Sequence, residues 1–402
     1  MKRIFLLLLV LCPFAAQAQN GGSVLSRFGI GELDNLAGAR QRGMGYTGAA
    51  VGSSYEIHAT NPAAWTFLSN LRLQAGGSYE YESSSKGAAL SYGSFAFKSL
   101  DLAIPFEESM RTRLSAGLHQ LSGIGYELNA HGSEGGKTYT SSYSGSGGLA
   151  FASIGMAVRP LPWLNIGAAA RWYFGTAEHE MVVDFDDADY FTTTQRRSTS
   201  HGGGGYVLGA VLTGMDGLAL SASVATTAEL DASRDLHFQY ATHDSTVRGA
   251  DGIQDIPVRY QAGLSYELDS RLLIAADVAI QDWTGARVFG VVQPALTSGY
   301  RISAGAEWKT GSASSQGMLR ASLLRFGVAH QKLSVLLDGV AQSETYGTVG
   351  FGFPVWAESR ADLSLEAGVR GASSDLLGSR LMVRFSFSIS VGENWFTRRE
   401  AD

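Results

Sequence analysis

The chain has 402 residues, of which 50 are glycine, 17% are charged and 10% are aromatic, and its net charge is −6. The low charge and the aromatic content exclude a disordered chain, and no apolar run reaches the about 20 residues that a membrane-spanning helix needs. Glycine at this frequency disfavours a helix-rich enzyme, because glycine costs up to about 1 kcal/mol per helical position relative to alanine, so strands are favoured.

The N-terminus has the pattern of a secretory leader. A basic start precedes an apolar run over 4–14, and Ala-Gln-Ala at 16–18 is a small-x-small cleavage signal. The run is too short to cross a membrane as a helix, so we predict a signal peptide over 1–18. The single cysteine, Cys12, lies in this leader, and Leu11 before it is not the small residue that a lipoprotein anchor requires. A mature chain without cysteine excludes a disulfide scaffold and a cysteine nucleophile.

The next segment, 19–68, is rich in glycine and alanine and shows no sustained alternation of apolar and polar residues. It is too short and too poor in large apolar residues to form a domain of its own. Two interpretations remain open, a periplasmic leader or a plug inside the mouth of a barrel. The Gly-x-Gly-x-x-Gly spacing at 43–48 matches a dinucleotide fingerprint, but no strand is predicted before it. We therefore interpret these glycines as a tightly turning backbone.

From about residue 71 onward the dominant period is two. The segment 380–392 is the clearest case, with apolar side chains at alternate positions from Leu381 to Val391 and polar ones between them. Many such segments exceed ten residues, which is longer than sandwich strands and about the length that a tilted strand needs to cross a bilayer. The opposite face carries Arg, Asp, Glu and Ser, which suits a wet lumen better than a dry core. This pattern predicts an all-β transmembrane antiparallel barrel.

We expect about fourteen strands, an even number, with the barrel over 69–396 and a short tail over 397–402. Long outer loops are predicted at 184–189, 198–205 and 241–252, where polar residues or glycines gather. An interfacial girdle is predicted from Trp163, Trp283, Trp308, Trp356 and Trp395. The expected strands are 71–83, 92–105, 111–130, 137–158, 163–184, 191–213, 217–240, 246–268, 271–287, 297–309, 318–337, 342–355, 360–371 and 380–392.

The third of these strands contains a polar interruption. Its apolar face continues from Leu118 to Ile124 only through Gln120 and Ser122, with Gly123 beside them. A polar break in a lipid-facing band is unfavourable unless something covers it or the strand bends. The interruption is therefore interpreted as a simple bulge or as a kink that opens the wall sideways.

Several motifs together resemble the long-chain fatty-acid outer-membrane transporter family (FadL-like), which includes uptake channels for aromatic hydrocarbons. A Pro-led strand at 256–266 followed by an acid-x3-Gln-x-Trp pattern at 277–283 matches that family. The stretches 145–149 and 350–354 are similar to patterns from its Bacteroidetes and Chlorobi branch. Three stretches, 26–33, 43–50 and 61–64, resemble the family's N-terminal hatch, and its candidate site residues are Gly43, Met44, Gly45, Asn61, Pro62 and Ala63.

The resemblance implies a monomeric, fourteen-stranded barrel in the outer membrane of a Gram-negative bacterium, with a hatch over 19–68 inside the lumen. It implies passive uptake of a small hydrophobic molecule that leaves through the wall at a kink near Gln120, Ser122 and Gly123. The expected surroundings are outer-membrane lipid, lipopolysaccharide and the barrel assembly machinery. No nucleic acid, cofactor, metal or enzymatic activity is expected. The chain departs from the family at its end, because Trp395 and Phe396 are followed by six further residues.

Six arginines are expected to point into the lumen, at positions 171, 259, 301, 320, 370 and 384. Most of them are expected to pair with acids of the lumen or the hatch, and one could hold a substrate carboxylate. The candidates for the carboxylate are Arg171, Arg301 and Arg384. Two other classes of function stay open, a scaffold or shuttle partner in protein secretion and a barrel enzyme acting on lipids.

Overall fold

The computed structural model describes residues 22–84, 91–187, 189–311, 322–356, 358–371 and 378–393. The expected leader, Arg320, Trp395 and the tail lie outside these residues. Within them, fourteen wall strands follow one another in chain order, as predicted. They are β2 (Leu71–Ser84), β3 (Ser91–Glu107), β4 (Thr112–Gln120) with β5 (Ser122–Glu134), β6 (Lys137–Leu161), β7 (Leu164–Phe185), β8 (Thr193–Met215), β9 (Leu218–Ala225) with β10 (Ala228–Gln239), β11 (Asp244–Ile256) with β12 (Arg259–Glu267), β13 (Leu272–Asp282), β16 (Ser298–Lys309), β17 (Leu323–Leu337), β18 (Val340–Pro354), β19 (Arg360–Arg370) and β20 (Arg380–Glu393).

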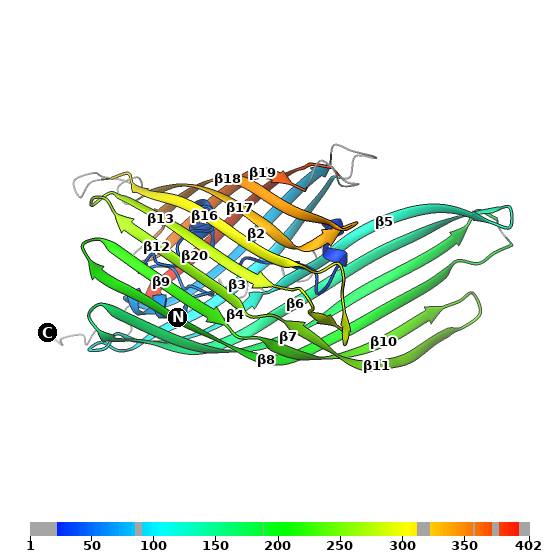
Figure 1. Ribbon diagram of the computed structural model, residues 1–402, viewed down its shortest axis with the longest axis horizontal. Helices are drawn as coiled ribbons and strands as arrows, with labels where there is room; N and C mark the ends of the chain where they lie inside the picture. Colours follow the sequence, from blue (N-terminus) through cyan, green and yellow to red (C-terminus); the bar gives the residue numbers. More distant parts are fainter. Residues whose placement is uncertain are drawn as a thin grey trace.

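The wall is a closed antiparallel barrel (Figure 1). Each wall strand pairs with the next along the chain, and β20 pairs back with β2 from Leu71↔Glu393 to Ser84↔Arg380. A small hairpin, β14 (Arg287–Val288) with β15 (Val291–Val292), lies in the connection between β13 and β16. Among the described residues, no helix is long and apolar enough to cross a membrane.

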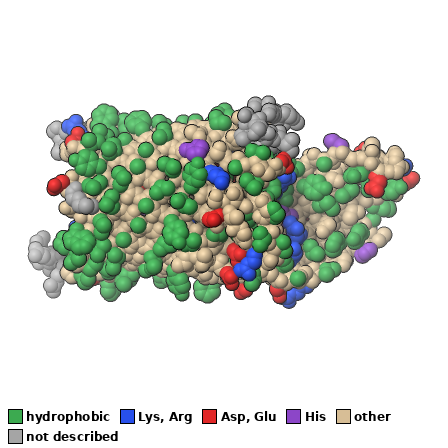
Figure 2. Space-filling model, viewed as in Figure 1, with side chains coloured by type: hydrophobic (Ala, Val, Ile, Leu, Met, Phe, Trp, Pro, Cys, Tyr) green, Lys and Arg blue, Asp and Glu red, His purple; other side chains and the backbone are tan. Residues whose placement is uncertain are grey.

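The two faces of the barrel wall follow the alternation of the sequence. Outward side chains are apolar and exposed, as with Ile154, Trp172 and Ile302, and Figure 2 shows hydrophobic side chains spread over this surface. Inward side chains include many buried charged and polar groups. A wall that is apolar outside and polar inside is what a strand barrel in a bilayer requires.

One end of the barrel has a tall extension, which we call the lobe: residues 126–146, 177–201 and 231–252. Its strands β5–β8, β10 and β11 run past the ends of the other wall strands in Figure 1. The other end has short turns, and Trp163, Trp308 and Trp356 are exposed there. Trp283, by contrast, is 2% exposed and belongs to a core cluster, so its assignment to the girdle was wrong.

Two of the predicted loops are strands in the structure. Residues 198–205 lie inside β8, and most of 241–252 lies in β11. The polar sequence was misleading because the strands of the lobe carry polar residues on their outer face. The chain turns near 186–192, close to the predicted loop at 184–189.

The N-terminal segment, residues 22–70, lies inside the barrel. It contains η2 (Val24–Arg27), β1 (Glu32–Leu33), α2 (Ala39–Gly43) and η3 (Pro62–Phe67). Helix α2 contacts β17, β18, β19 and β20, whereas η3 contacts β4, β6, β7 and β8. Because these strands come from opposite parts of the wall, the segment spans the lumen.

Candidate functional site

The third wall strand is broken where the sequence is polar. β4 pairs with β3 on one side and β6 on the other, but β5 pairs with β6 and not with β3. The pairing of β3 with β4 stops at Ser99↔His119, so residues 91–98 of β3 are paired only with β2 among the described strands. The wall therefore has a break next to Leu121, where β3 and β5 are not paired.

A short stretch of the N-terminal segment, Ile30–Asp34, covers this break; we call it the latch. Its strand β1 pairs with β5 in the register Glu32↔Gly123 and Leu33↔Ser122. The hydroxyl of Ser122 donates a hydrogen bond to the carbonyl oxygen of Ile30 at 2.6 Å. The N–H of Asp34 donates to the carbonyl oxygen of Leu121 at 2.8 Å. The latch thus adds a strand to the edge that the break leaves free.

Lys98 ties the latch to the opposite side of the break. Its ammonium group lies 2.9 Å from the Asp34 carboxylate and donates to the side-chain oxygen of Gln120 at 3.1 Å. Lys98 is on β3 and Gln120 ends β4, so one side chain connects the β3–β4 side of the break to the latch, and the latch pairs with β5 on the other side. These are charge-assisted bonds, which are stronger than neutral ones.

A cavity of about 220 Å³ lies behind the latch. The N-terminal segment contributes Phe28 and Ile30, and the break contributes Gln120 and Gly123. Inward-facing positions of several strands complete the lining, among them Arg259, Arg301 and Arg384. Trp283 and Leu296 line the same space from the connection between β13 and β16.

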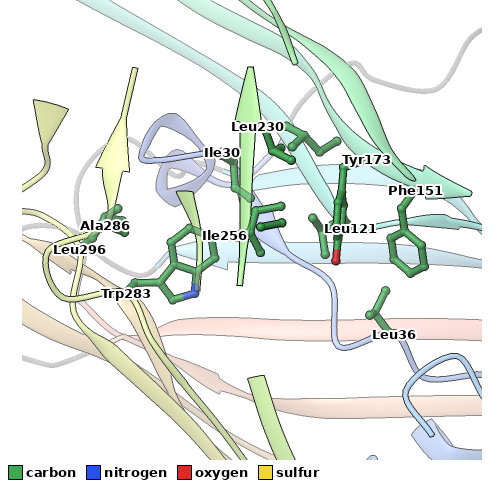
Figure 3. Close-up of a cluster of buried hydrophobic side chains, with 12 residues drawn as sticks. Ile30, Leu36, Leu121, Phe151, Tyr173, Leu230, Ile256, Trp283, Ala286 and Leu296 are labelled. Atoms are coloured by element: carbon green, nitrogen blue, oxygen red, sulfur yellow. The ribbon is translucent and has the colours of Figure 1, made fainter. Parts of the chain in front are cut away.

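An apolar cluster borders this cavity (Figure 3). Figure 3 shows Ile30 and Leu36 of the N-terminal segment lying among side chains of the wall, including Leu121 at the break. Trp283, Ile256 and Leu230 belong to the same cluster and are buried. The cavity therefore has one apolar border and one charged border, which suits a ligand with an apolar body and a polar end.

The three arginines predicted to hold a carboxylate have different surroundings. Arg384 is neutralised, because it pairs with Glu80 at 2.6 Å and with Glu366 at 2.9 Å. Arg171 donates to the carbonyl oxygen of Ala59 at 2.8 Å and lies over the ring of Phe151.

Arg301 is the candidate that remains available. It is 4% exposed, makes no ion pair with any described residue, and has Nε and Nη1 without hydrogen-bond partners. Its guanidinium lies 5.3 Å from the ring centroid of Tyr46 and borders the cavity. Arg259 borders the same cavity and donates one long bond of 3.5 Å to the carbonyl oxygen of Asn35. Asp277 and Asp34 interact electrostatically with Arg301 and Arg259 but form no ion pair with them. Because a buried cation without a carboxylate in contact is unfavourable, this pair favours an anionic group in the cavity.

Arg370 is the centre of a buried network between the N-terminal segment and the wall. It lies 2.5 Å from Glu32 of the latch, 2.8 Å from Glu82 and 2.5 Å from Glu344, and a fourth acid, Glu80, is at 3.3 Å. Arg370 itself is fully buried. The predicted pairing of lumen arginines with lumen or hatch acids is therefore found here.

A second network, on the adjoining strands β16, β17 and β19, holds helix α2 against the wall. Arg40 pairs with Glu307 at 2.9 Å and with Glu56 at 3.3 Å. Arg325 pairs with the same Glu307 at 2.7 Å and with Asp362 at 2.6 Å. The two networks fill the lumen around α2, so the N-terminal segment is anchored by charge as well as by shape.

Residues 43–45 pass very close to the wall. A Cβ on Gly43 would lie 2.8 Å from the Cα of Gly350, and Gly45 has φ +70° with the backbone of Val328 equally near. Met44 between them is 1% exposed. These two glycines are needed for close approach, which agrees with the predicted tight turn rather than a cofactor loop.

Asn61, Pro62 and Ala63 form the start of η3. The Asn61 side chain accepts from the N–H of Ala63 at 3.1 Å, as an N-cap residue does, and Pro62 occupies the first turn. The Asn61 amide also donates to the carbonyl oxygen of Ala210 at 3.4 Å. The triplet thus starts a helix that packs on the wall.

Two neighbouring groups of the N-terminal segment, Glu56 and His58, have shifted pKa values. The pKa of the carboxyl group is raised and that of the imidazole is lowered. Burial, opposed by Arg40, raises the pKa of Glu56 to about 7, and burial together with Arg40 lowers the pKa of His58 to about 3. The His58 ring lies 3.5 Å from the Glu56 carboxylate, and its Nδ1 accepts from Gln41 at 3.1 Å. Both groups therefore favour their neutral forms while the segment is docked.

These shifts predict opposite pH responses for two single variants. A raised carboxyl pKa weakens docking as pH rises from about 4.5 to about 7, and a lowered imidazole pKa weakens docking as pH falls below about 6.5. Between pH 4.5 and 6.5 the two effects oppose each other. His58→Gln should make docking fall more steeply with pH than in the wild type, and Glu56→Gln should make it fall less or rise. Proteolytic protection of residues 22–70 measures this, and equal slopes in both variants would contradict the assignment.

Sequence reasoning placed residues 30–33 in the hatch but missed that they cover the break, and it missed Lys98. β1 has only two residues, so no periodicity could reveal it. The available signal was the pair of acids Glu32 and Asp34, which are unusual in a glycine-rich stretch.

The chain is similar to known proteins in sequence and in fold. The family model described as BamG matches residues 1–402. A Pseudomonas aeruginosa FadL homologue is 12% identical with a TM-score of 0.64, covering 90% of this chain and 99% of that one. The Pseudomonas putida toluene transporter TodX is 16% identical (TM-score 0.60; 89% and 99%), and the Ralstonia pickettii toluene transporter TbuX is 13% identical (0.58; 89% and 99%). No curated protein matches the sequence. The predicted FadL-like barrel fold is confirmed.

Proposed function

The chain belongs to the BamG family, and we propose that it is an outer-membrane channel for passive uptake of small hydrophobic molecules that carry an anionic group, such as long-chain fatty acids. The single observation that carries this proposal is Arg301, a buried cation at the cavity with no ion pair among the described residues. The solved barrels of similar fold include toluene transporters, which supports a small hydrophobic cargo; the anionic group rests on Arg301. In this proposal 1–18 is a signal peptide, 19–68 a hatch, 69–396 the barrel and 397–402 a tail.

The proposed route enters from the lobe, which stands outside the cell, and reaches the cavity behind the latch. The apolar cluster around Trp283 and Ile30 receives the apolar body, and Arg301 with Arg259 holds the carboxylate. A straight path to the short-turn end is filled by the Arg370 and Arg40 networks. Exit therefore proceeds through the break between β3 and β5 once the latch has moved away from Gly123.

The proposal predicts that Arg301→Gln separates charged from neutral cargo. Uptake of radiolabelled palmitate by cells should fall at least about tenfold, because one ion pair or charged hydrogen bond contributes about 1.5–3 kcal/mol. Uptake of toluene should stay within about twofold. Arg271→Gln, at an exposed residue of a short turn, is the control. Unchanged palmitate uptake in Arg301→Gln would contradict the role of this arginine.

A second candidate function is a scaffold or shuttle partner in protein secretion. Two observations favour it, the covered break in the wall and the ion pairs that fill the lumen around α2. This function predicts a stable complex in membranes and no effect of any cavity variant on uptake. Uptake assays on a deletion strain complemented with wild type or Arg301→Gln distinguish the two.

A further inference from the structure

Where the lobe begins, the outer face of the wall changes from apolar to polar and the inner face becomes more apolar. Along β7 the outward residues Trp172 and Phe174 are apolar and 71% and 41% exposed. Beyond them the outward positions carry Glu178 and Glu180, and the Glu180 carboxylate pairs with Arg196 of β8 on that face at 2.8 Å. An outer surface of this kind cannot face lipid acyl chains, so the lobe stands in water.

The inner face of the lobe is apolar and aromatic. The ring centroids of Tyr139 and Phe185 are 5.4 Å apart, and the stacked rings of Phe238 and Tyr240 have centroids 6.4 Å apart. Tyr143 is 39% and Val247 50% exposed. Exposed apolar side chains gathered on one face in water indicate a binding surface, and Gln195 and Arg197 of β8 lie among them on this face. The strand register places these side chains on it: Tyr126, Leu128, Tyr139, Tyr143, Met181, Val183, Phe185, Leu236, Phe238 and Val247.

One strand edge of the lobe is unpaired beside this face. Within 244–251 of β11, residues 244–248 and 251 pair with β10 on one side, with a bulge at 249–250, and no described strand pairs with the other side. Lower down, the N–H of Gly290 donates to the carbonyl oxygen of Ile253 at 2.7 Å, so the free edge begins above that contact. An unpaired edge offers backbone N–H and C=O groups that only another peptide strand can satisfy in register.

The same region carries unpaired positive charge. Arg197 and Arg234 are on the inner face, and neither makes an ion pair with a described residue. Arg234 lies over the ring of Phe289 at 3.7 Å and leaves its Nε without a partner. Arg196, the neighbour of Arg197 on the outer face, has Glu180 as its partner. A ligand for the inner face is therefore expected to bring a carboxylate.

We propose that the lobe docks an extended segment of another cell-surface protein, which adds as a strand to residues 244–251. Its apolar side chains lie on Phe238, Val247 and their neighbours, and an acidic side chain reaches Arg197 and Arg234. The free backbone edge favours a protein over a lipid. A second copy of this chain is disfavoured, because it would bring the arginines of one copy against those of the other. This docking is independent of the uptake proposed above and uses only the orientation of the lobe.

Single cysteines test the proposal, because the only native cysteine is Cys12 in the expected leader. Val247→Cys is on the inner face, and Thr246→Cys, the adjacent position, is on the outer face. A membrane-impermeant maleimide should label Val247→Cys at least about tenfold more slowly in intact cells than in purified protein. Thr246→Cys should be labelled equally in both. Equal rates for Val247→Cys, or no labelling of Thr246→Cys in cells, would overturn the proposal.

Charge reversal and hydrogen exchange identify the occupant. Adding Arg197→Glu should restore fast labelling of Val247→Cys in cells, whereas the matched outer-face change Arg196→Glu should not. Heat-modified gel mobility checks that each variant remains a folded barrel. The amide hydrogens of 244–251 should exchange more slowly in native membranes than after purification. Slow labelling without amide protection would indicate lipid, and a cross-linked adduct of two copies of this chain would indicate self-association; either result would overturn the proposal.

Discussion

Replacing Arg370 with methionine should lower the free energy of unfolding by about 3–5 kcal/mol, the usual cost of removing one partner from a buried ion pair. Arg370 is fully buried and faces four carboxylates, at 2.5 Å from Glu32 and Glu344, 2.8 Å from Glu82 and 3.3 Å from Glu80. Methionine keeps much of the volume but leaves these carboxylates to repel one another. The latch should also loosen, because Glu32 belongs to it.

The matched control is Arg196→Met. Arg196 pairs with Glu180 on the outer face, where its side chain is 54% exposed, so the loss should be at most about 1 kcal/mol. Urea-induced loss of heat-modified gel mobility in detergent measures both variants. Equal stability of Arg370→Met and Arg196→Met would show that the four carboxylates are compensated in another way.

Gly327→Val should displace the N-terminal segment from the lumen. A Cβ at Gly327 would lie 2.1 Å from the carbonyl carbon of Met44 and 2.2 Å from the nitrogen of Gly45. Backbone atoms of the wall and of the N-terminal segment meet here, so no side chain can rotate away, and the overpacking should cost about 3 kcal/mol or more. We expect residues 22–70 to become sensitive to protease while the barrel stays folded.

Gly347→Val is the control for this variant, because a Cβ at Gly347 has no heavy atom within 4 Å. It should retain the protection of the N-terminal segment. Limited proteolysis of purified protein, followed by mass measurement of the fragments, distinguishes the two. Full protection of residues 22–70 from protease in Gly327→Val would mean that docking of the N-terminal segment does not require the close contact between Gly327 and residues 44–45.

The barrel could be predicted from sequence because lipid imposes a strict rule on it. Most wall strands alternate below the lobe as at 380–392, and the fourteen predicted strands were found within the described residues. The rule ends at the lobe, where water lies on both sides and outward residues become polar. For that reason 198–205 and 241–252 were wrongly predicted as loops.

The site was less accessible to sequence reasoning. The polar interruption at Gln120 and Ser122 coincides with the break between β4 and β5, but the cover of the break is a two-residue strand with no pattern of its own. The ion pairs depend on which strands face each other across the lumen: Arg370 meets Glu32 across 338 positions of chain. Which arginine stays unpaired, Arg301 rather than Arg384, follows from that arrangement and from no local signal.

The central claim is that cargo leaves through the break between β3 and β5 when the latch moves, and a disulfide across the latch tests it most directly. Leu33 and Ser122 face each other in the β1–β5 pair, and Cα atoms of such pairs lie about 4.5–5.5 Å apart, within the range of a disulfide. Leu33→Cys with Ser122→Cys should abolish palmitate uptake when oxidised and recover it with a reductant, and each single variant should transport in both states. Unchanged uptake with the disulfide formed would contradict the claim.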